Sequence, residues 1–83
     1  MRTTAETEAR ETAEAHRWMV KTRYSEGMAD VSYYRGNRTI CAVFGPAGRV
    51  TDVTVLDAGK VAQFIPSNDV RKRAQLLALL ATP

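Results

Sequence analysis

This sequence has little cysteine and no long apolar stretch. Cys41 is the only cysteine, so no disulfide can form within the chain, and a lone thiol is typical of a reducing compartment. No apolar run approaches the roughly 20 residues that cross a bilayer. The segment Thr3 to Glu14 is polar where an export signal needs an apolar core. The sequence therefore predicts a cytoplasmic protein with no membrane contact.

Side chains that carry chemistry are also scarce. His16 is the only histidine, no metal-ligand spacing is present, and neither a nucleophile elbow nor a phosphate-loop motif occurs. His16 and Cys41 would form a base and nucleophile only if the fold brought them together. A packing histidine and a buried strand cysteine explain them more simply. We expect no enzyme, no cofactor and no metal site, and a cysteine-dependent enzyme stays as the third hypothesis.

The length and charge of the chain set the remaining limits. With 83 residues and a net charge of +3, residues 1–83 are expected to form a single small domain. A domain of this size buries about 60 to 65% of its unfolded surface, so its stability is marginal. The positive charge favours nucleic acid or another acidic surface as a partner, although it also serves ordinary solubility.

The N-terminal segment, Thr3 to Arg23, is predicted to form one helix. Thr3 and Glu6 have the spacing of a capping box, and acidic residues precede basic ones as the helix dipole prefers. Gly27 is expected to end the helix. Trp18 lies off the alanine stripe and is either an exposed anchor for a partner or a cover for a sheet edge.

The middle of the chain changes to a strand pattern rich in β-branched and aromatic residues. Gly36-Asn37 fits a type II′ hairpin turn, and the glycine-framed stretch from Gly45 to Gly48 is read as a second turn because Pro46 removes an amide that a phosphate cradle would need. Val61 to Ile65 is either a fourth edge strand or an extended arm. The predicted fold is α+β, with a helix, a three- or four-stranded antiparallel meander and a helix (αβββα). Its three central strands are Asp30–Arg35, Arg38–Phe44 and Arg49–Leu56.

The C-terminal helix is expected to begin after Pro66, with Ser67 or Asn68 as its cap, and to run to about Ala81. No charged residue follows Arg73. A small monomer does not usually leave the apolar surface of such a helix exposed to solvent, so we predict a homodimer. The residues assigned to the dimer interface are Leu76, Leu79 and Leu80.

Basic residues at the start of that helix are the main candidates for binding. Cations there oppose the helix dipole, and a bound phosphate would remove the conflict. The simpler interpretation is that they are solvated residues that keep a leucine-rich helix soluble. Aromatic and basic residues around the first hairpin are able to stack on bases and neutralise phosphates. The candidate nucleic-acid-binding residues are Tyr34, Arg35, Arg38, Arg49, Arg71, Lys72 and Arg73.

The segment AGRVTDVTV, Ala47 to Val55, together with the order helix, three strands, helix, resembles the YbaB-type nucleoid-associated family. The match is carried by Gly48, Val50, Val53 and Val55. The resemblance implies dimerisation and DNA binding with little sequence preference. The element order also looks like a double-stranded-RNA-binding domain, in which basic residues at the start of the second helix grip phosphates. The tight turn between Arg35 and Arg38 departs from the long groove-reaching loop of that second family.

The sequence as a whole favours a non-catalytic homodimer that binds nucleic acid through the phosphate backbone with low sequence specificity. DNA is favoured over RNA. The alternative is a small phage- or mobile-element-type protein-binding module, an inhibitor or adaptor, that acts on an acidic partner surface.

Overall fold

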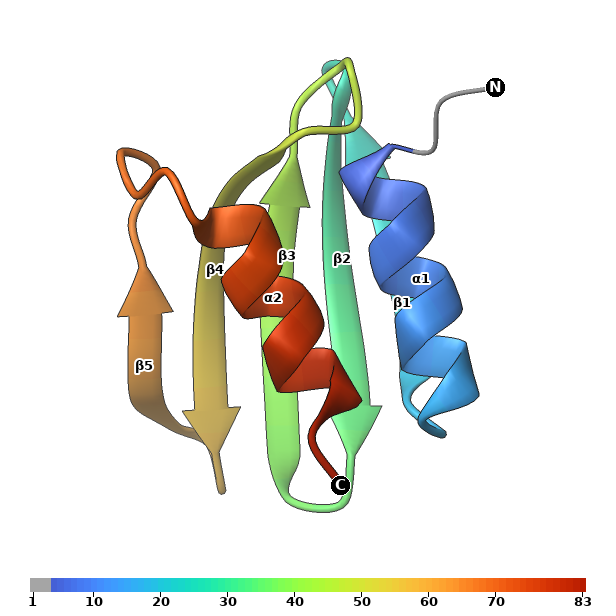
Figure 1. Ribbon diagram of the computed structural model, residues 1–83, viewed down its shortest axis with the longest axis vertical. Helices are drawn as coiled ribbons and strands as arrows, with labels where there is room; N and C mark the ends of the chain where they lie inside the picture. The colour runs from blue at the N-terminus through green and yellow to red at the C-terminus, as the bar shows by residue number, and fades with distance from the viewer. Residues whose placement is uncertain (1–3) are drawn as a thin grey trace.

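A five-stranded antiparallel sheet, covered by two helices on one face, forms the protein in the computed structural model, which describes residues 4–83 (Figure 1). The strands follow the order of the chain across the sheet, from β1 at one edge to β5 at the other. The α+β class and the antiparallel meander are confirmed, but the sheet has five strands where three or four were predicted. In chain order the elements are α1 (Ala5–Ala15), β1 (Met19–Ser25), β2 (Met28–Arg35), β3 (Arg38–Phe44), β4 (Val50–Asp57), β5 (Lys60–Ile65) and α2 (Lys72–Ala81).

The first helix is shorter than predicted. The prediction of one helix over Thr3–Arg23 is wrong for the second half of that segment. The chain turns at Arg17, which has a φ of 66°, and then enters β1, which pairs with β2 over its whole length. Thr4 caps α1 by accepting a hydrogen bond from the backbone N–H of Thr7 at 3.1 Å. The predicted cap Thr3 lies outside the described residues.

Tight turns join most of the strands. Gly36 has a φ of 61° at the first position of the β2–β3 turn, as the type II′ turn requires. Gly27, the predicted end of a helix, lies instead in the turn between β1 and β2. Val61–Ile65 belongs to β5, so this segment is an edge strand and not an extended arm.

The core lies between the sheet and the helices. Three alanines of α1, at positions 5, 9 and 13, are buried, and their small size lets the helix lie close to the sheet. The larger side chains come from the sheet and from α2, and alternate residues of each strand point toward the helices. The largest fully buried side chains are Val31, Tyr33, Ile40, Phe44, Val53, Val55, Ile65, Leu76 and Leu80.

The predicted dimer interface on the C-terminal helix needs correction. Leu76 and Leu80 are fully buried within this chain, and Leu79 is partly buried against the same core. The apolar face of α2 is covered by the protein's own sheet and is not available to a second copy. The helix also begins later than predicted, with Arg71 as its N-cap in place of Ser67 or Asn68.

Candidate functional site

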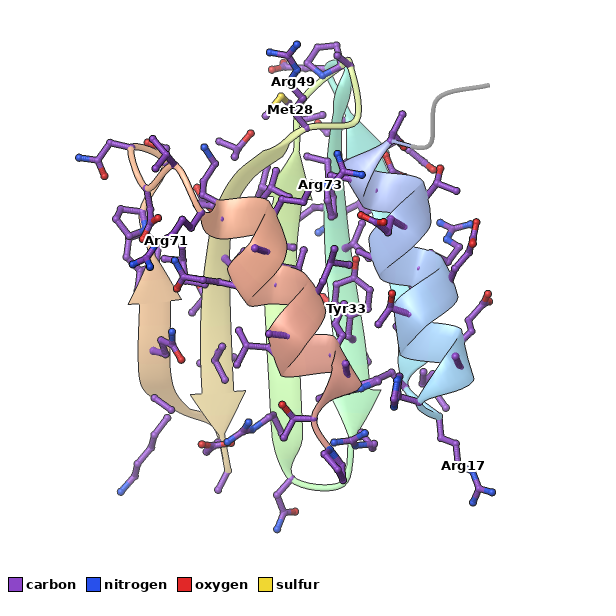
Figure 2. All side chains as sticks on the ribbon, viewed as in Figure 1. Arg17, Met28, Tyr33, Arg49, Arg71 and Arg73 are labelled. Carbon is purple, nitrogen blue, oxygen red and sulfur yellow. The ribbon has the colours of Figure 1, made fainter. Side chains whose placement is uncertain are left out.

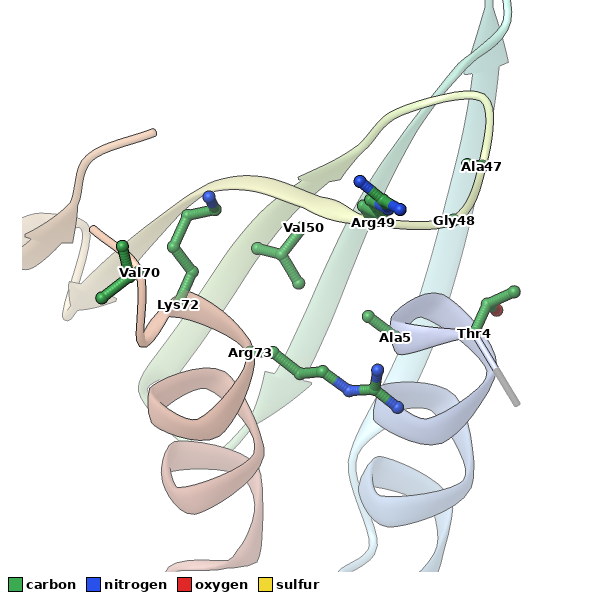
Figure 3. Close-up of a pocket in the computed structure, with 9 residues that line it drawn as sticks. All are labelled: Thr4, Ala5, Ala47, Gly48, Arg49, Val50, Val70, Lys72 and Arg73. Carbon is green, nitrogen blue, oxygen red and sulfur yellow. The ribbon is translucent and has the colours of Figure 1, made fainter. Parts of the chain in front are cut away.

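A cleft of about 560 Å³ opens where the β3–β4 loop meets the first turns of both helices (Figure 3). Figure 1 shows that α1 and α2 begin at the same end of the molecule, so their positive dipole ends converge there. The lining residues are Thr4, Ala5, Ala47, Gly48, Arg49, Val50, Val70, Lys72 and Arg73.

The β3–β4 loop forms one wall of the cleft and is fastened to the start of α1. Inside the loop, the N–H of Gly48 donates to the carbonyl of Gly45, and the N–H of Gly45 donates to the carbonyl of Arg49, both at 2.9 Å. The N–H of Glu6 donates to the carbonyl of Gly48 at 3.1 Å. A Cβ on Gly48 would lie 2.7 Å from the Cβ of Thr4, so glycine permits this close approach. The loop is a structural turn that holds Arg49 at the rim.

The start of α2 forms the opposite wall, and the carboxylate of Asp69 lies there. Asp69 accepts from the backbone N–H of Arg71 at 2.8 Å and from the side-chain amide of Gln75 at 3.0 Å. The hydrogen bond from Arg71, followed by that from Gln75, holds the pKa of Asp69 below its usual value. Lys72 donates from Nζ to the carbonyl of Ser67 at 2.9 Å. A carboxylate at this helix start partly offsets the repulsion between the dipole and the adjacent cations.

Arg73 crosses the cleft to the first helix. Its Nε donates to Oε1 of Glu8 at 2.9 Å, and its Nη2 lies 2.8 Å from the same oxygen. Both side chains are about half exposed, with 51% and 41% of their surface accessible, so the pair is expected to contribute at most about 1 kcal/mol to stability. Arg73 therefore links α1 to α2 while its guanidinium stays at the cleft (Figures 2 and 3).

The cleft brings together three of the predicted binding residues, Arg49, Lys72 and Arg73. Arg71 is exposed beside it but does not line it. Among the residues that the structure describes, the lining contains no histidine, cysteine or carboxylate and has three basic side chains, so the arrangement is suited to holding an anion. Sequence reasoning missed Thr4 and Val70, because only the tertiary fold brings those segments to the same place.

Two predicted binding residues, Arg35 and Arg38, form structural contacts at the opposite end of the molecule. Arg35 lies over the ring of Trp18, 4.3 Å from its centroid, and donates to the carbonyls of His16 at 3.1 Å and Thr82 at 2.6 Å. It thereby fastens the C-terminal end of α2 to the end of α1. Its guanidinium therefore binds backbone carbonyls of this chain and not a ligand.

Arg38 forms a two-bond ion pair with Asp57 at distances of 2.8 and 3.2 Å. The hydrogen bond to Arg38 lowers the pKa of the Asp57 carboxyl. This pair joins the ends of β3 and β4. Tyr34, the remaining predicted residue, lies on the sheet face away from the helices, since its cross-strand neighbours alternate with those that point into the core. The seven candidates therefore do not form one surface.

Trp18 is a core residue. It is 4% exposed, and its Nε1 donates to the carbonyl of Leu80 at 2.8 Å. The interpretation as an exposed anchor is wrong. His16 ends α1, whereas Cys41 lies on the helix-free face of the sheet beside Ser32, so the fold does not bring the histidine and the cysteine together.

No protein-family model matches this chain, and neither a curated protein nor a solved structure is significantly similar to it. Among residues 4–83, no helix is both long and apolar enough to cross a membrane. The resemblance to the YbaB-type family stays a prediction.

Proposed function

We propose that this protein binds nucleic acid without catalysis, by contacting the phosphate backbone at the cleft between the two helix starts. The observation that carries the proposal is the convergence of Arg49, Lys72 and Arg73 on one cleft. The dipole at a helix start favours an anion, and basic side chains add a long-range attraction.

Low sequence specificity follows from the composition of the cleft. Phosphate contacts fix the position of a nucleic acid but do not distinguish its bases. Within residues 4–83, the lining offers no asparagine, glutamine or aromatic side chain for reading a base edge or stacking on a base. The resemblance to the YbaB-type family favours DNA over RNA as the partner.

The test is a salt titration of DNA and RNA binding by the native chain and two matched double variants. Arg49→Ala with Lys72→Ala removes two cations of the cleft, whereas Arg17→Ala with Lys60→Ala removes two exposed cations elsewhere. Each lost phosphate contact should reduce the salt slope by about 1, so the cleft variant should lose about 2 units and the control variant almost none.

Two results would contradict the proposal. Absence of binding even at low salt would exclude nucleic acid as the partner, since phosphate contacts strengthen steeply there. An equal reduction of the salt slope in the two double variants would show that binding depends on net charge and does not involve the cleft.

A protein-binding module is the second candidate, and Val70 favours it. This side chain is 96% exposed at the rim of the cleft, where an acidic protein with an apolar contact would use it and a phosphate backbone would not. Val70→Ser should leave nucleic-acid affinity unchanged. A loss of nucleic-acid affinity in Val70→Ser would contradict a pure phosphate contact.

A further inference from the structure

Within residues 4–83, both helices lie on one face of the five-stranded sheet, and no helix covers the other face (Figure 1). Residues that alternate with the core positions point to this face, and the strand register arranges them in rows across the sheet. One row contains Met19, Tyr34, Thr39, Leu56 and Val61; the next contains Lys21, Ser32, Cys41, Thr54 and Phe64; the third contains Arg23, Asp30, Val43 and Asp52. We call these residues the open face.

Large apolar side chains are concentrated on the open face. Met19 is 63% exposed, Tyr34 40%, Val61 67% and Phe64 56%. They lie on both edge strands and on β2. Half-buried Leu56, Cys41 and Val43 fill the positions between them. Large exposed apolar side chains gathered on one face of a small protein and bordered by polar residues are typical of an interaction site.

The charges of the open face are balanced. Lys21 and Arg23 on β1 are matched by Asp30 on β2 and Asp52 on β4, and Arg23 is directly opposite Asp30 in the register. The positive excess of the chain therefore lies elsewhere. A face with no net charge does not attract a polyanion, and two identical faces with no net charge do not repel one another. The charge pattern favours a second copy of this chain over nucleic acid as the occupant.

The area of the open face is close to the lower limit for a dimer. Five strands about 4.8 Å apart, each with about six residues rising about 3.4 Å, cover about 480 Å². Burial of this face on two copies removes about 960 Å² from water, which is close to the roughly 1,000 Å² that a biological interface needs and below the roughly 1,200 Å² at which standard interfaces begin. Pairing through the free edge of β5 is less favourable, because a bulge between Val55 and Leu56 interrupts the β4–β5 register beside it.

We infer that the open face is the interface of a homodimer. Two copies related by a two-fold axis place their sheets face to face, about 10 Å apart, with the helices on the outside. The inference rests on the apolar rows and the charge balance of the sheet and does not require the nucleic-acid proposal.

The first test compares the mass of the native chain and two variants by sedimentation equilibrium at micromolar concentration. The native protein should have twice the 9.2 kDa mass of the chain. Phe64→Glu places a charge in the open face and should weaken the dimer at least 100-fold, whereas Val70→Glu makes the same kind of change on an exposed residue outside the open face and should leave it intact. A monomeric native protein, or a Phe64→Glu variant as dimeric as the native chain, would overturn the inference.

A second test uses the native chain and is therefore unaffected if a variant fails to fold. Cys41 lies in the middle row of the open face, so a second copy seated there should shield its thiol. The rate of reaction with a thiol reagent should fall at least tenfold between dilute and concentrated protein. A constant rate in a sample shown to be dimeric would place the interface elsewhere, for example at the edge of β5.

Discussion

Removal of the Tyr33 hydroxyl should stabilise this protein or leave its stability unchanged. Tyr33 is completely buried in the core between the helices and the sheet (Figure 2). Within residues 4–83 its phenol oxygen has no hydrogen-bond partner. A buried polar group without a partner costs about 1 to 3 kcal/mol of desolvation. Tyr33→Phe keeps the ring and removes this cost, so the free energy of unfolding should rise by up to that amount.

The pH dependence of stability gives the same residue a second signature. Burial first, and the nearby Glu6 second, raise the pKa of the Tyr33 phenol, against a smaller opposing effect of Arg10. In the unfolded chain the phenol ionises near pH 10, whereas the folded protein keeps it neutral. Below pH 10 both states hold the proton. Above pH 10 the unfolded state binds fewer protons, so stability falls by about 1.4 kcal/mol per pH unit.

Urea unfolding at pH 8 and pH 11, followed by the fluorescence of the single tryptophan Trp18, measures both effects. The advantage of Tyr33→Phe over the native chain should be about 1.4 kcal/mol larger at pH 11 than at pH 8. Tyr34→Phe, which removes the same hydroxyl from an exposed ring, should change stability at pH 8 by less than about 0.5 kcal/mol. A Tyr33→Phe variant less stable than the native chain by more than 1 kcal/mol would refute the reasoning, because it would mean that the hydroxyl is bonded.

Two further substitutions test the contacts that shape the cleft and the core. Gly48→Ala should destabilise the protein by about 2 kcal/mol or more, since Gly48 has a φ of 75° and the added Cβ would lie 2.7 Å from that of Thr4. Gly36→Ala, at a φ of 61° with open space around it, should cost only about 1 kcal/mol, and equal losses on urea unfolding would disprove the close approach. Trp18→Phe removes the hydrogen bond to the buried carbonyl of Leu80 and should lower stability by about 1 to 3 kcal/mol. An unchanged thermal midpoint for Trp18→Phe would show that this bond contributes nothing.

The parts of the fold that sequence reasoning predicted are those fixed by local chemistry. The strand Arg38–Phe44 has the bounds that the pattern predicts, because a glycine-led turn precedes it and a glycine loop follows. The α+β class follows from the same contrast between a polar helical segment at the start and β-branched residues in the middle.

The first strand was missed because two periods fit the same residues. Val20 and Tyr24 continue a helical stripe at a spacing of four, but Val20 and Thr22 also alternate with Lys21 and Arg23 as a strand does. Pairing with β2 along the whole of β1 decides for the strand. This pairing is a hairpin that starts at Ser25 and Met28 on either side of a turn at Gly27, so the glycine that was interpreted as a helix end was the local signal for it. One consequence is that the open face was also missed.

The candidate site was predicted only in part because charge pairing is a tertiary property. Glu8 and Arg73 are 65 residues apart in the sequence, and Arg38 and Asp57 are 19 apart. No local pattern indicates that Arg38 is held by a carboxylate while Arg49 stays at a rim. The fold therefore separates the basic candidates: Arg35 and Arg38 hold the structure together, whereas Arg49, Lys72 and Arg73 line the cleft. Arg71 is exposed beside the cleft, and Arg73 also links the two helices.

The two proposed surfaces are compatible because they lie on different parts of the molecule. The cleft is formed by the β3–β4 loop and the helix starts, and the open face is on the other side of the sheet. A dimer built through the open face leaves the helices, and with them both clefts, in the outer layers. The balanced charges of Lys21, Arg23, Asp30 and Asp52 suit a face that must meet its own copy. The cations at the helix starts suit the anion proposed for the cleft, and the two proposals do not compete for the same residues.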